Sequence, residues 1–224
     1  SLMREPERVR DCVAAMSERV DIPVTVKHRL GLDDDESYDG LAEFVGTVAQ
    51  GGCQVFIAHA RNAWLEGLSP KENREIPPLR YDWVLRLKND FPALTFVLNG
   101  GITSIEECTE HLKSFDGVML GRAAYQNPWL LSEVDSQLFG DERVCSNRDA
   151  VCERLHSYII EHKKMGGRPH HVLRHVLGLF QRQPGGKHFR RELSLRMHRP
   201  NADANVLNAA LAVTKRVEPT QQTT

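Results

Sequence analysis

Cysteine pairs, long apolar runs and low-complexity stretches are all missing from this 224-residue sequence, and each absence excludes a class of protein. The cysteines show no CxxC pair and no regular spacing, and they are Cys12, Cys53, Cys108, Cys145 and Cys152. An odd count without a secretory signal is most simply interpreted as free thiols in a reducing compartment. No stretch approaches the roughly 18 apolar residues of a membrane span, and residues 1–4 do not resemble a targeting leader. These absences predict a cytoplasmic protein without a membrane segment.

The net charge excludes little by itself, but the distribution of charge is informative. The chain carries 29 Lys and Arg against 30 Asp and Glu, a formal net charge of −1. Between Lys163 and Arg199, however, ten residues are basic and only Glu192 is acidic, and six of the ten histidines fall between His162 and His198. Such clustering is the electrostatic footprint of nucleic-acid binding, although a solvated helical face would show the same composition.

The first 125 residues alternate between two hydrophobic periods. Short apolar runs rich in β-branched and aromatic residues predict four strands, at 22–26, 55–58, 95–98 and 118–120. Apolar residues at helical spacing predict helices at 3–20, 38–50 and 81–90, and one after Ser104, which is expected to be its N-cap. Short apolar strands that alternate with amphipathic helices indicate a parallel sheet covered on both faces.

Four βα units amount to half of an eight-stranded barrel, and the pattern alone leaves a flavodoxin-like open sheet as the alternative. The positions of the polar residues favour the barrel. Four of these residues are each expected just after the carboxyl end of a strand, and they are Lys27, His59, Asn99 and Arg122. Barrel enzymes assemble their active sites at these ends. The predicted fold class is therefore α/β, the C-terminal half of a TIM (β/α)8 barrel.

Strand signals end near residue 145, and the remaining sequence predicts a small all-α domain. Helical spacing is present at 148–165, within 171–183, at 189–197 and at 205–217, with Gly and Pro residues at the turns between these segments. The predicted division is a partial barrel over 1–140, a basic helical domain over 146–217 and a polar tail over 218–224 that is expected to fray.

Two strand ends that contain glycine carry the most specific signal for an anion. Asn99, Gly100 and Gly101 close the third predicted strand, and Gly121 and Arg122 close the fourth. Glycine lets backbone N–H groups approach a phosphate, the following helix supplies positive potential, and an arginine can add a bidentate contact. Loops after the last two strands of a barrel often bind phosphate in this way, although ordinary tight turns also use glycine pairs.

Lys27 and His59 extend this set to the first two strands. A lysine that leaves an apolar strand holds its ammonium in the barrel mouth, where it needs an anionic or electron-rich partner such as the N1–C2=O edge of a flavin. The alternatives are a lysine that reaches solvent and a histidine with a structural role. Cations in this arrangement favour a phosphate or a flavin over a metal. No metal is predicted, since no Cys or acid completes a site around His170, His171 and His175.

None of the cysteines is placed as a nucleophile or a proton donor. Cys12 and Cys152 lie on apolar faces of predicted helices. Cys53 follows a Gly-Gly helix stop, and Cys108 lies in the helix after Gly101. Buried, inert thiols are expected for all five cysteines.

Several stretches together resemble the tRNA-dihydrouridine synthases. These stretches are residues 24–31, 59–61 leading into 67–79, 99–102 and 118–122, and they occur in the family's order, with the resemblance extending to about Met197. The long element at 71–79 resembles the bacterial A-type branch, whose members reduce uridines 20 and 20a in the D-loop.

The resemblance implies that a reduced FMN, recharged by NADPH, delivers hydride to C6 of uracil, while a cysteine on the loop after the fourth barrel strand protonates C5. The target base must leave its stack to reach the flavin. By motif, Lys27 and His59 would contact the isoalloxazine and ribityl region. The residues that would hold the phosphate end are Asn99, Gly100, Gly101, Gly121 and Arg122.

The resemblance also implies tRNA as the macromolecular partner. Lys71 and Arg74 match loop positions that contact tRNA, and Lys187 and Arg190 lie in the helical domain that grips the tRNA body in this family. The basic stretch at 163–199 then has RNA as its target. The full-length parent is expected to be a cytoplasmic monomer.

The sequence departs from the family pattern at its start. The first four barrel strands have no counterpart here, and neither do a flavin-contacting Gln, the N-terminal flavin loop and the catalytic cysteine, so the proton donor is expected upstream. Half a barrel would expose the apolar flanks of its sheet. The chain alone is therefore predicted to be inactive, with the activity belonging to a longer parent. A different FMN-dependent barrel oxidoreductase and a non-catalytic tRNA-binding fragment are the alternatives.

Overall fold

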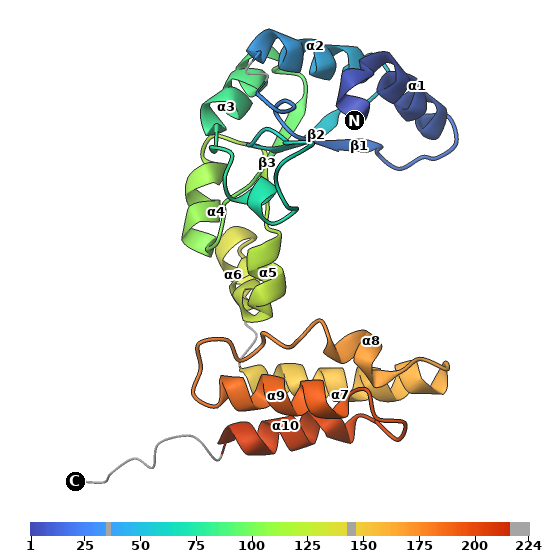
Figure 1. The fold of residues 1–224 in the computed structure, drawn as a ribbon, viewed down its shortest axis with the longest axis vertical. Coiled ribbons are helices and arrows are strands. Elements are labelled where there is room, and N and C mark those ends of the chain that lie inside the picture. Colours follow the sequence, from blue (N-terminus) through green and yellow to red (C-terminus); the bar gives the residue numbers. More distant parts are fainter. Residues whose placement is uncertain (35–36, 143–146, 216–224) are drawn as a thin grey trace, which may run out of the picture. The chain divides into compact units, whose positions relative to one another are not determined.

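The computed structural model describes residues 1–34, 37–142 and 147–215, and the chain divides into two units between Gly121 and Arg122 (Figure 1). The first unit alternates helices and strands. Its α-helices and 3-10 helices (η) are η1 (Leu2–Arg4), α1 (Pro6–Ser17), α2 (Tyr38–Ala49), η2 (Glu72–Arg74), α3 (Tyr81–Asp90) and α4 (Ile105–Leu112). Its strands are β1 (Thr25–His28), β2 (Val55–His59), β3 (Thr95–Asn99) and β4 (Gly117–Met119).

The four strands form one parallel sheet in the order β1-β2-β3-β4. Each strand pairs with the next one along the chain, and a helix lies between them in sequence. A flavodoxin-like sheet would reverse its strand order within its first strands, so the observed order disfavours that alternative. The α/β organisation with a parallel sheet is confirmed, and it is consistent with part of a (β/α)8 barrel.

One face of the sheet packs against helices and forms the core of this unit. The strand residues with no solvent exposure on this face are Phe56, Ala58, Phe96 and Leu98. The rings of Phe56 and Phe96 stack with their centroids 5.9 Å apart. The helices contribute apolar residues at i, i+3, i+4 and i+7 to this core, which in α2 are Leu41, Phe44, Val45 and Val48. Alternate strand residues therefore face away from these helices.

Local capping explains where two of the helices begin. The hydroxyl of Ser37 accepts a hydrogen bond from the N–H of Gly40 at 3.0 Å and caps α2. Ser104 accepts from the N–H of Glu107 at 3.2 Å, which confirms its predicted role as the N-cap of α4. At the other end of α2, Gly52 adopts a positive φ of 97°, as the predicted glycine stop requires.

Two predicted boundaries at the start of the chain are wrong. The first strand covers Thr25–His28 and not 22–26, and Ile22 is 72% exposed, because a β-branched run without a paired neighbour gains nothing from strand geometry. The predicted helix at 3–20 is a short 3-10 turn followed by α1, with Pro6 as the first residue of α1. Proline suits this position because its missing N–H would be unsatisfied there anyway.

The second unit is built from helices in the part that the structure describes. They are α5 (Arg122–Gln126), η3 (Pro128–Glu133), α6 (Val134–Leu138), α7 (Arg148–Lys164), α8 (Pro169–Leu173), α9 (Gly186–Arg196) and α10 (Asn205–Lys215). Its core brings together residues from four of them, including Ile159, Leu173, Phe189, Leu193 and Leu207. The sequence did not predict the short helices at 122–138, and it overestimated the helix within 171–183, of which only α8 forms.

Several predictions fall on residues outside the described ranges. These are the polar tail at 218–224, the last two residues of the helix predicted at 205–217, Cys145, and two of the acidic residues that precede α2. Among the described residues, no helix is both long and apolar enough to cross a membrane.

Candidate functional site

The face of the sheet turned away from the helices carries the polar residues of the candidate site. Lys27 lies inside β1, opposite Ile57 of β2, and strand alternation places both on this face. His59 and Asn99 are the last residues of β2 and β3 and lie opposite each other. Asn99 in turn lies opposite Met119 of β4. Lys27, His59 and Asn99 were expected just beyond their strands, and they are instead within the last two residues of them.

The environment of Lys27 lowers the pKa of its ammonium. Much of the residue remains exposed, yet partial burial lowers the pKa of its ammonium below the ordinary 10.5, and the nearby charge of Arg29 lowers it further. The two effects act in the same direction because desolvation and a like charge both penalise the cation. An anionic partner on this face would offset both effects.

The turn after β3 is built around two glycines with positive φ, 114° for Gly100 and 75° for Gly101. A Cβ atom at Gly100 would lie 2.7 Å from Cδ2 of His59, so the imidazole occupies the space beside this glycine. A Cβ atom at Gly101 would meet Leu79 and the hydroxyl of Tyr81. Only glycine combines this backbone conformation with such close neighbours.

Two side chains hold this turn in place. The hydroxyl of Tyr81 donates a hydrogen bond to the carbonyl of Gly100 at 2.6 Å, and burial raises the pKa of this phenol, so it remains a donor. The amide of Asn99 donates to the carbonyl of Met119 at 2.8 Å and ties β3 to the end of β4. The turn is therefore fixed before any ligand binds.

Three arginines gather next to this face, in the segments that follow β1 and β2. Burial lowers the pKa of Arg29, and the charges of Arg61 and Arg74 lower it further. The guanidinium of Arg29 donates to the carbonyls of Asn62 at 3.2 Å and Asn73 at 3.1 Å, so it fastens the long loop to the end of β1. Like charges held together in this way attract an anion.

The predicted tRNA contacts of the first unit lie on this loop. Lys71 and Arg74 are both exposed, at the start and the end of η2. Ser69 and Glu72 cap the turn reciprocally, since the N–H of Ser69 donates to the carboxylate of Glu72 at 2.9 Å and the N–H of Glu72 donates back to the hydroxyl at 3.3 Å. The loop thus presents its two cations from an ordered turn.

The remaining predicted residues follow β4 or belong to the second unit. Gly121 has open space around it and no positive φ, so a side chain would fit there. Arg122 is the first residue of α5 and of the second unit. Lys187 and Arg190 are exposed on α9 and line a cavity of about 710 Å³ within the second unit.

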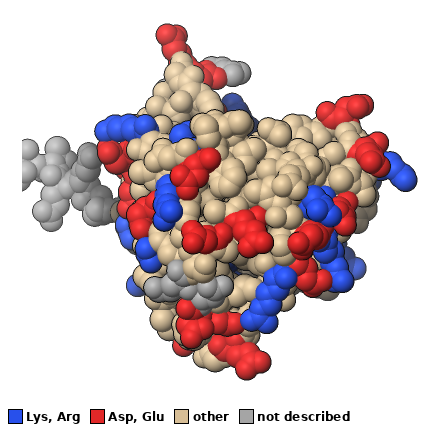
Figure 2. Space-filling view, turned by 90° about the horizontal axis from the view of Figure 1, so that it is seen from above, with Lys and Arg blue, Asp and Glu red and all other residues tan. Residues whose placement is uncertain are grey.

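The face of the first unit that bears α1 and α2 does not carry charge of one sign. Figure 2 shows acidic and basic side chains interspersed on the face that bears α1 and α2. On α1 and before it, Arg8 pairs with Glu5 at 2.7 Å and Arg10 pairs with Asp11 at 2.8 Å. Across the residues that the structure describes, no group of three His, Cys, Asp or Glu side chains is arranged to hold a metal ion.

The family model described as dihydrouridine synthase matches residues 1–215, which is nearly the whole chain. The chain belongs to the dihydrouridine synthase family. This membership disfavours the alternative of an FMN-dependent oxidoreductase from another family.

Curated relatives named tRNA-dihydrouridine(20/20a) synthase are similar to this chain throughout its matched length. The relative from Pseudomonas syringae pv. tomato is 55% identical over 209 residues, which cover 93% of this chain and 62% of the relative. The relative from Shewanella oneidensis is 53% identical with the same coverage, and that from Vibrio vulnificus is 52% identical over 212 residues, or 94% and 65%. The chain therefore spans less than two thirds of the length of these relatives.

In this member of the dihydrouridine synthase family, three of the cysteines are buried as predicted, namely Cys53, Cys108 and Cys152. Burial raises the pKa of each of these thiols, to about 12 for Cys152. The prediction for Cys12 is wrong, because this residue lies on the exposed side of α1. Helical periodicity placed Cys12 one residue from the buried Val13, and only the packing of α1 decides which of the two faces inward.

Sequence reasoning missed four residues that shape the site. Tyr81 and Leu79 support the glycine turn, and Arg29 fastens the loop. His28, the last residue of β1, is buried against the rings of Phe44 and Phe56. One signal was available for the arginines, since Arg29 follows Lys27 and Arg61 follows His59 by the same two residues. No comparable signal marks Tyr81 or His28, whose roles depend on contacts distant in sequence.

Proposed function

We propose that this chain provides the flavin-phosphate side and the RNA-binding surfaces of an enzyme that reduces uridine to 5,6-dihydrouridine in tRNA, at positions 20 and 20a of the D-loop. The proposed cofactor is FMN, and the proposed reductant is NADPH. The observation that carries the proposal is the arrangement of Lys27, His59 and the Gly100–Gly101 turn along one open sheet face, in a chain of the dihydrouridine synthase family.

The donor set fits a flavin mononucleotide chemically. Lys27 and His59 would lie along the ring and ribityl chain, and the groups proposed for the phosphate end are Asn99, Gly100, Gly101, Gly121 and Arg122. Positive φ gives the two turn glycines a backbone conformation that residues with side chains rarely adopt, and the backbone N–H groups of this turn would contact the phosphate. A bound, reduced FMN would supply the hydride. Lys27 would hold positive charge beside the N1–C2=O edge of the ring, which is negative in the reduced cofactor.

The proposed RNA surfaces lie in both units. In the first unit, Lys71 and Arg74 would meet phosphates, with Arg29 holding their loop in place. In the second, the helices of the 146–217 segment would form a separate basic domain that binds the tRNA body, with Lys187 and Arg190 among its contacts. Ten of the residues from 163 to 199 are basic and one is acidic, so a polyanion is the partner of suitable charge.

We further propose that the chain alone does not reduce uridine, because none of its described cysteines is placed to protonate C5. Cys53 lies just before the amino end of β2, whereas His59 is at the carboxyl end of this strand. The thiol of Cys53 donates to the carbonyl of Val55 at 3.3 Å. Cys108 faces the core from α4, and Cys12 lies on the outside of α1. Cys145 lies outside the described residues.

Flavin binding tests the first part of the proposal. Purified chain should quench the fluorescence of added FMN, and Lys27→Met should weaken binding by about tenfold or more, as expected when one charge-assisted hydrogen bond is removed. Lys113→Met is the matched control, since Lys113 is exposed on the helix side and pairs with Glu110 at 2.5 Å. Equal affinity of both variants and wild type would refute the assignment of Lys27.

A variant of Arg122 tests whether flavin and tRNA are bound by different residues. Arg122→Gln should weaken FMN retention and leave the affinity for a tRNA transcript unchanged. Equal losses of FMN and tRNA binding would contradict this assignment.

Turnover and salt dependence test the remaining claims. The chain supplied with FMN, NADPH and unmodified tRNA should form no dihydrouridine. Product formation would refute the proposal that the isolated chain is inactive. Binding of tRNA should weaken steeply with salt, and Lys71→Ala with Arg74→Ala should lower the slope of log K against log salt by roughly 1 for each phosphate that is no longer neutralised. A salt-independent affinity would contradict phosphate recognition.

A further inference from the structure

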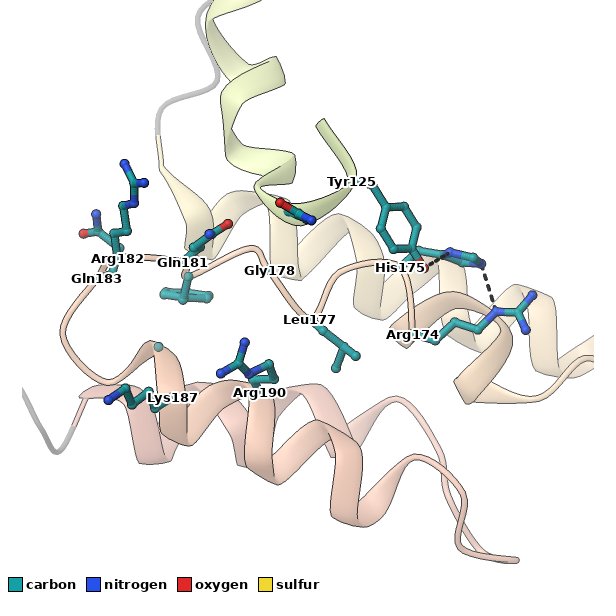
Figure 3. A pocket seen from close by; sticks show the side chains of 13 residues that line it. Tyr125, Arg174, His175, Leu177, Gly178, Gln181, Arg182, Gln183, Lys187 and Arg190 are labelled. Carbon is teal, nitrogen blue, oxygen red and sulfur yellow. Dashed lines mark hydrogen bonds between the residues drawn. The ribbon is translucent and has the colours of Figure 1, made fainter. Parts of the chain in front are cut away.

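The second unit contains a cavity of about 710 Å³ that lies between α5, the segment after α8 and the start of α9 (Figure 3). This volume is in the range of roughly 300–1,000 Å³ that is typical of small-molecule pockets. Four of its thirteen lining residues are basic, three are glutamines, and none of the described residues that line it is acidic. All of the lining residues belong to the second unit, so the cavity is complete without the sheet.

One side of the cavity concentrates positive charge. Lys187 and Arg190 are three residues apart on α9 and so share a helix face, and Arg182 comes from the loop before that helix. Figure 3 shows Lys187 and Arg190 on the side of α9 that is turned toward this loop. Within the described residues, the side chains of these three cations make no hydrogen bond or ion pair. Three cations without acidic partners around one hollow provide a site for phosphate oxygens.

The opposite side of the cavity offers an aromatic ring whose position is fixed. Nε of Arg174 donates to Nε2 of His175 at 3.0 Å, which places the imidazole proton on Nδ1, since a guanidinium can only donate. Nδ1 of His175 lies 3.2 Å from the hydroxyl of Tyr125, so it donates to that oxygen and leaves the phenol its own proton to give. Tyr125 is 58% exposed, so its ring is available for stacking on a base.

The loop between these two sides is ordered and strained. Arg182 adopts a left-handed backbone with φ of 60°, which is uncommon for a residue with a side chain. Successive turns hold it, because the N–H of Gln181 donates to Gly178 at 2.9 Å and that of Gln183 donates to Phe180 at 3.1 Å. Strain that the surrounding structure maintains is concentrated at functional sites.

Together these features match the two parts of a nucleotide. We propose that this cavity binds one nucleotide of a bound RNA, extruded from its stack, with its phosphates at Arg182, Lys187 and Arg190 and its base on Tyr125. The exposed amides of Gln181 and Gln183 would then read the edge of the base, as Gln and Asn side chains do in nucleic-acid complexes. This inference rests on the proposed function, in which the second unit binds tRNA, and it assigns to that unit a pocket for a single nucleotide.

The first experiment measures small probes on the full chain by calorimetry, using UMP, AMP, ribose 5-phosphate and inorganic phosphate. The nucleoside monophosphates should bind about tenfold more tightly than ribose 5-phosphate, as stacking of one base requires. Tyr125→Leu should abolish this difference and leave inorganic phosphate binding unchanged. Lys187→Ala with Arg190→Ala should weaken all four probes. Equal binding of the monophosphates and ribose 5-phosphate to wild type would reduce the cavity to a phosphate-binding surface and overturn the proposal.

Arg154→Ala is the matched control, because Arg154 is an exposed cation of α7 that does not line the cavity. It should leave every probe affinity unchanged. Unfolding midpoints equal to that of wild type would show that the cavity variants remain folded. Gln181 is exposed, and Gln181→Ala provides a second variant of the base-binding part. It should reduce the binding of UMP and AMP and leave the binding of ribose 5-phosphate and inorganic phosphate unchanged.

Competition identifies the source of the nucleotide. An unmodified tRNA transcript should displace the monophosphate, whereas displacement by NADPH and not by tRNA would make the cavity a dinucleotide site and overturn the proposal. Direct tRNA binding is measured in parallel by filter retention. A chain that binds tRNA but no monophosphate would refute only the pocket, whereas monophosphate binding without any tRNA binding would refute the proposed function as well.

Discussion

The imidazole of His59 lies beside Gly100, at the place where any other residue would carry its side chain. His59 is the last residue of β2, and Gly100 directly follows Asn99, the last residue of β3, which lies opposite His59 in the sheet register. The positive φ of Gly100 and the position of His59 are therefore coupled, since a change of one displaces the other. Because of this coupling, a substitution at Gly100 tests the geometry of the site.

Gly100→Ala should destabilise the first unit by about 1–3 kcal/mol, because alanine resists a φ of 114° and its Cβ would collide with the His59 ring. Chemical denaturation measures this change. Gly121→Ala is the control and should stay within about 0.5 kcal/mol of wild type, since no atom lies near a Cβ there. Equal stability of the two variants would contradict the described turn.

Stability should depend on pH through His28. Burial lowers the pKa of this imidazole from 6.5 to about 4, while a hydrogen bond to the carbonyl of Arg29 and the charge of Lys27 act as smaller influences in opposite directions. Because the folded pKa lies below the unfolded one, the contribution is fully present above pH 6.5 and is lost as the pH falls toward 4. The loss should approach about 3 kcal/mol.

The check is the free energy of unfolding of wild type and His28→Leu between pH 7 and pH 4.5. The difference between the two proteins isolates His28 from the carboxylates that titrate nearby. A difference that does not change with pH would show that His28 is not held as the buried neutral form.

Arg148 should stabilise the second unit through its guanidinium plane. Its central carbon lies 4.3 Å from the centroid of Trp129, and its Nε donates to the carbonyl of Leu179 at 2.8 Å. Arg148→Lys keeps the charge but removes the planar group, and we expect a destabilisation of about 1–2 kcal/mol. Trp129 fluorescence reports the unfolding if the other tryptophans are replaced by Phe. Arg154→Lys, on the exposed side of the same helix, should be neutral, and an equal effect at both positions would refute the stabilising role of the guanidinium.

Thiol labelling should separate the cysteines. In a Cys145→Ser background, a thiol reagent should modify Cys12 under native conditions more than about tenfold faster than the buried thiols, whose pKa values burial raises. Mass spectrometry of the labelled peptides identifies the sites. Rapid labelling of Cys152 in the folded protein would contradict its place in the core.

Much of the first unit could be predicted from sequence because its signals are local. Hydrophobic period, glycine stops and the Ser104 cap act within a few residues of one another, and they identified α2, α3 and the three later strands. The start of β1 was misplaced because strand ends depend on pairing with Val55, thirty residues away. The short helices at 122–138 escaped prediction because segments of five or six residues carry too few turns for a period to appear.

The sequence by itself determined the family of this chain, its alternation of strands and helices, and the residue types that a phosphate or flavin requires, since all of these lie in short ordered motifs. Only the tertiary structure decided that His59 fills the space beside Gly100, that Tyr81 holds the turn, that His28 is buried and Cys12 is not, and that Tyr125 and Arg182 line one cavity. The reason is physical: these relationships join residues far apart in the chain, and packing selects them from many arrangements that local preferences allow equally.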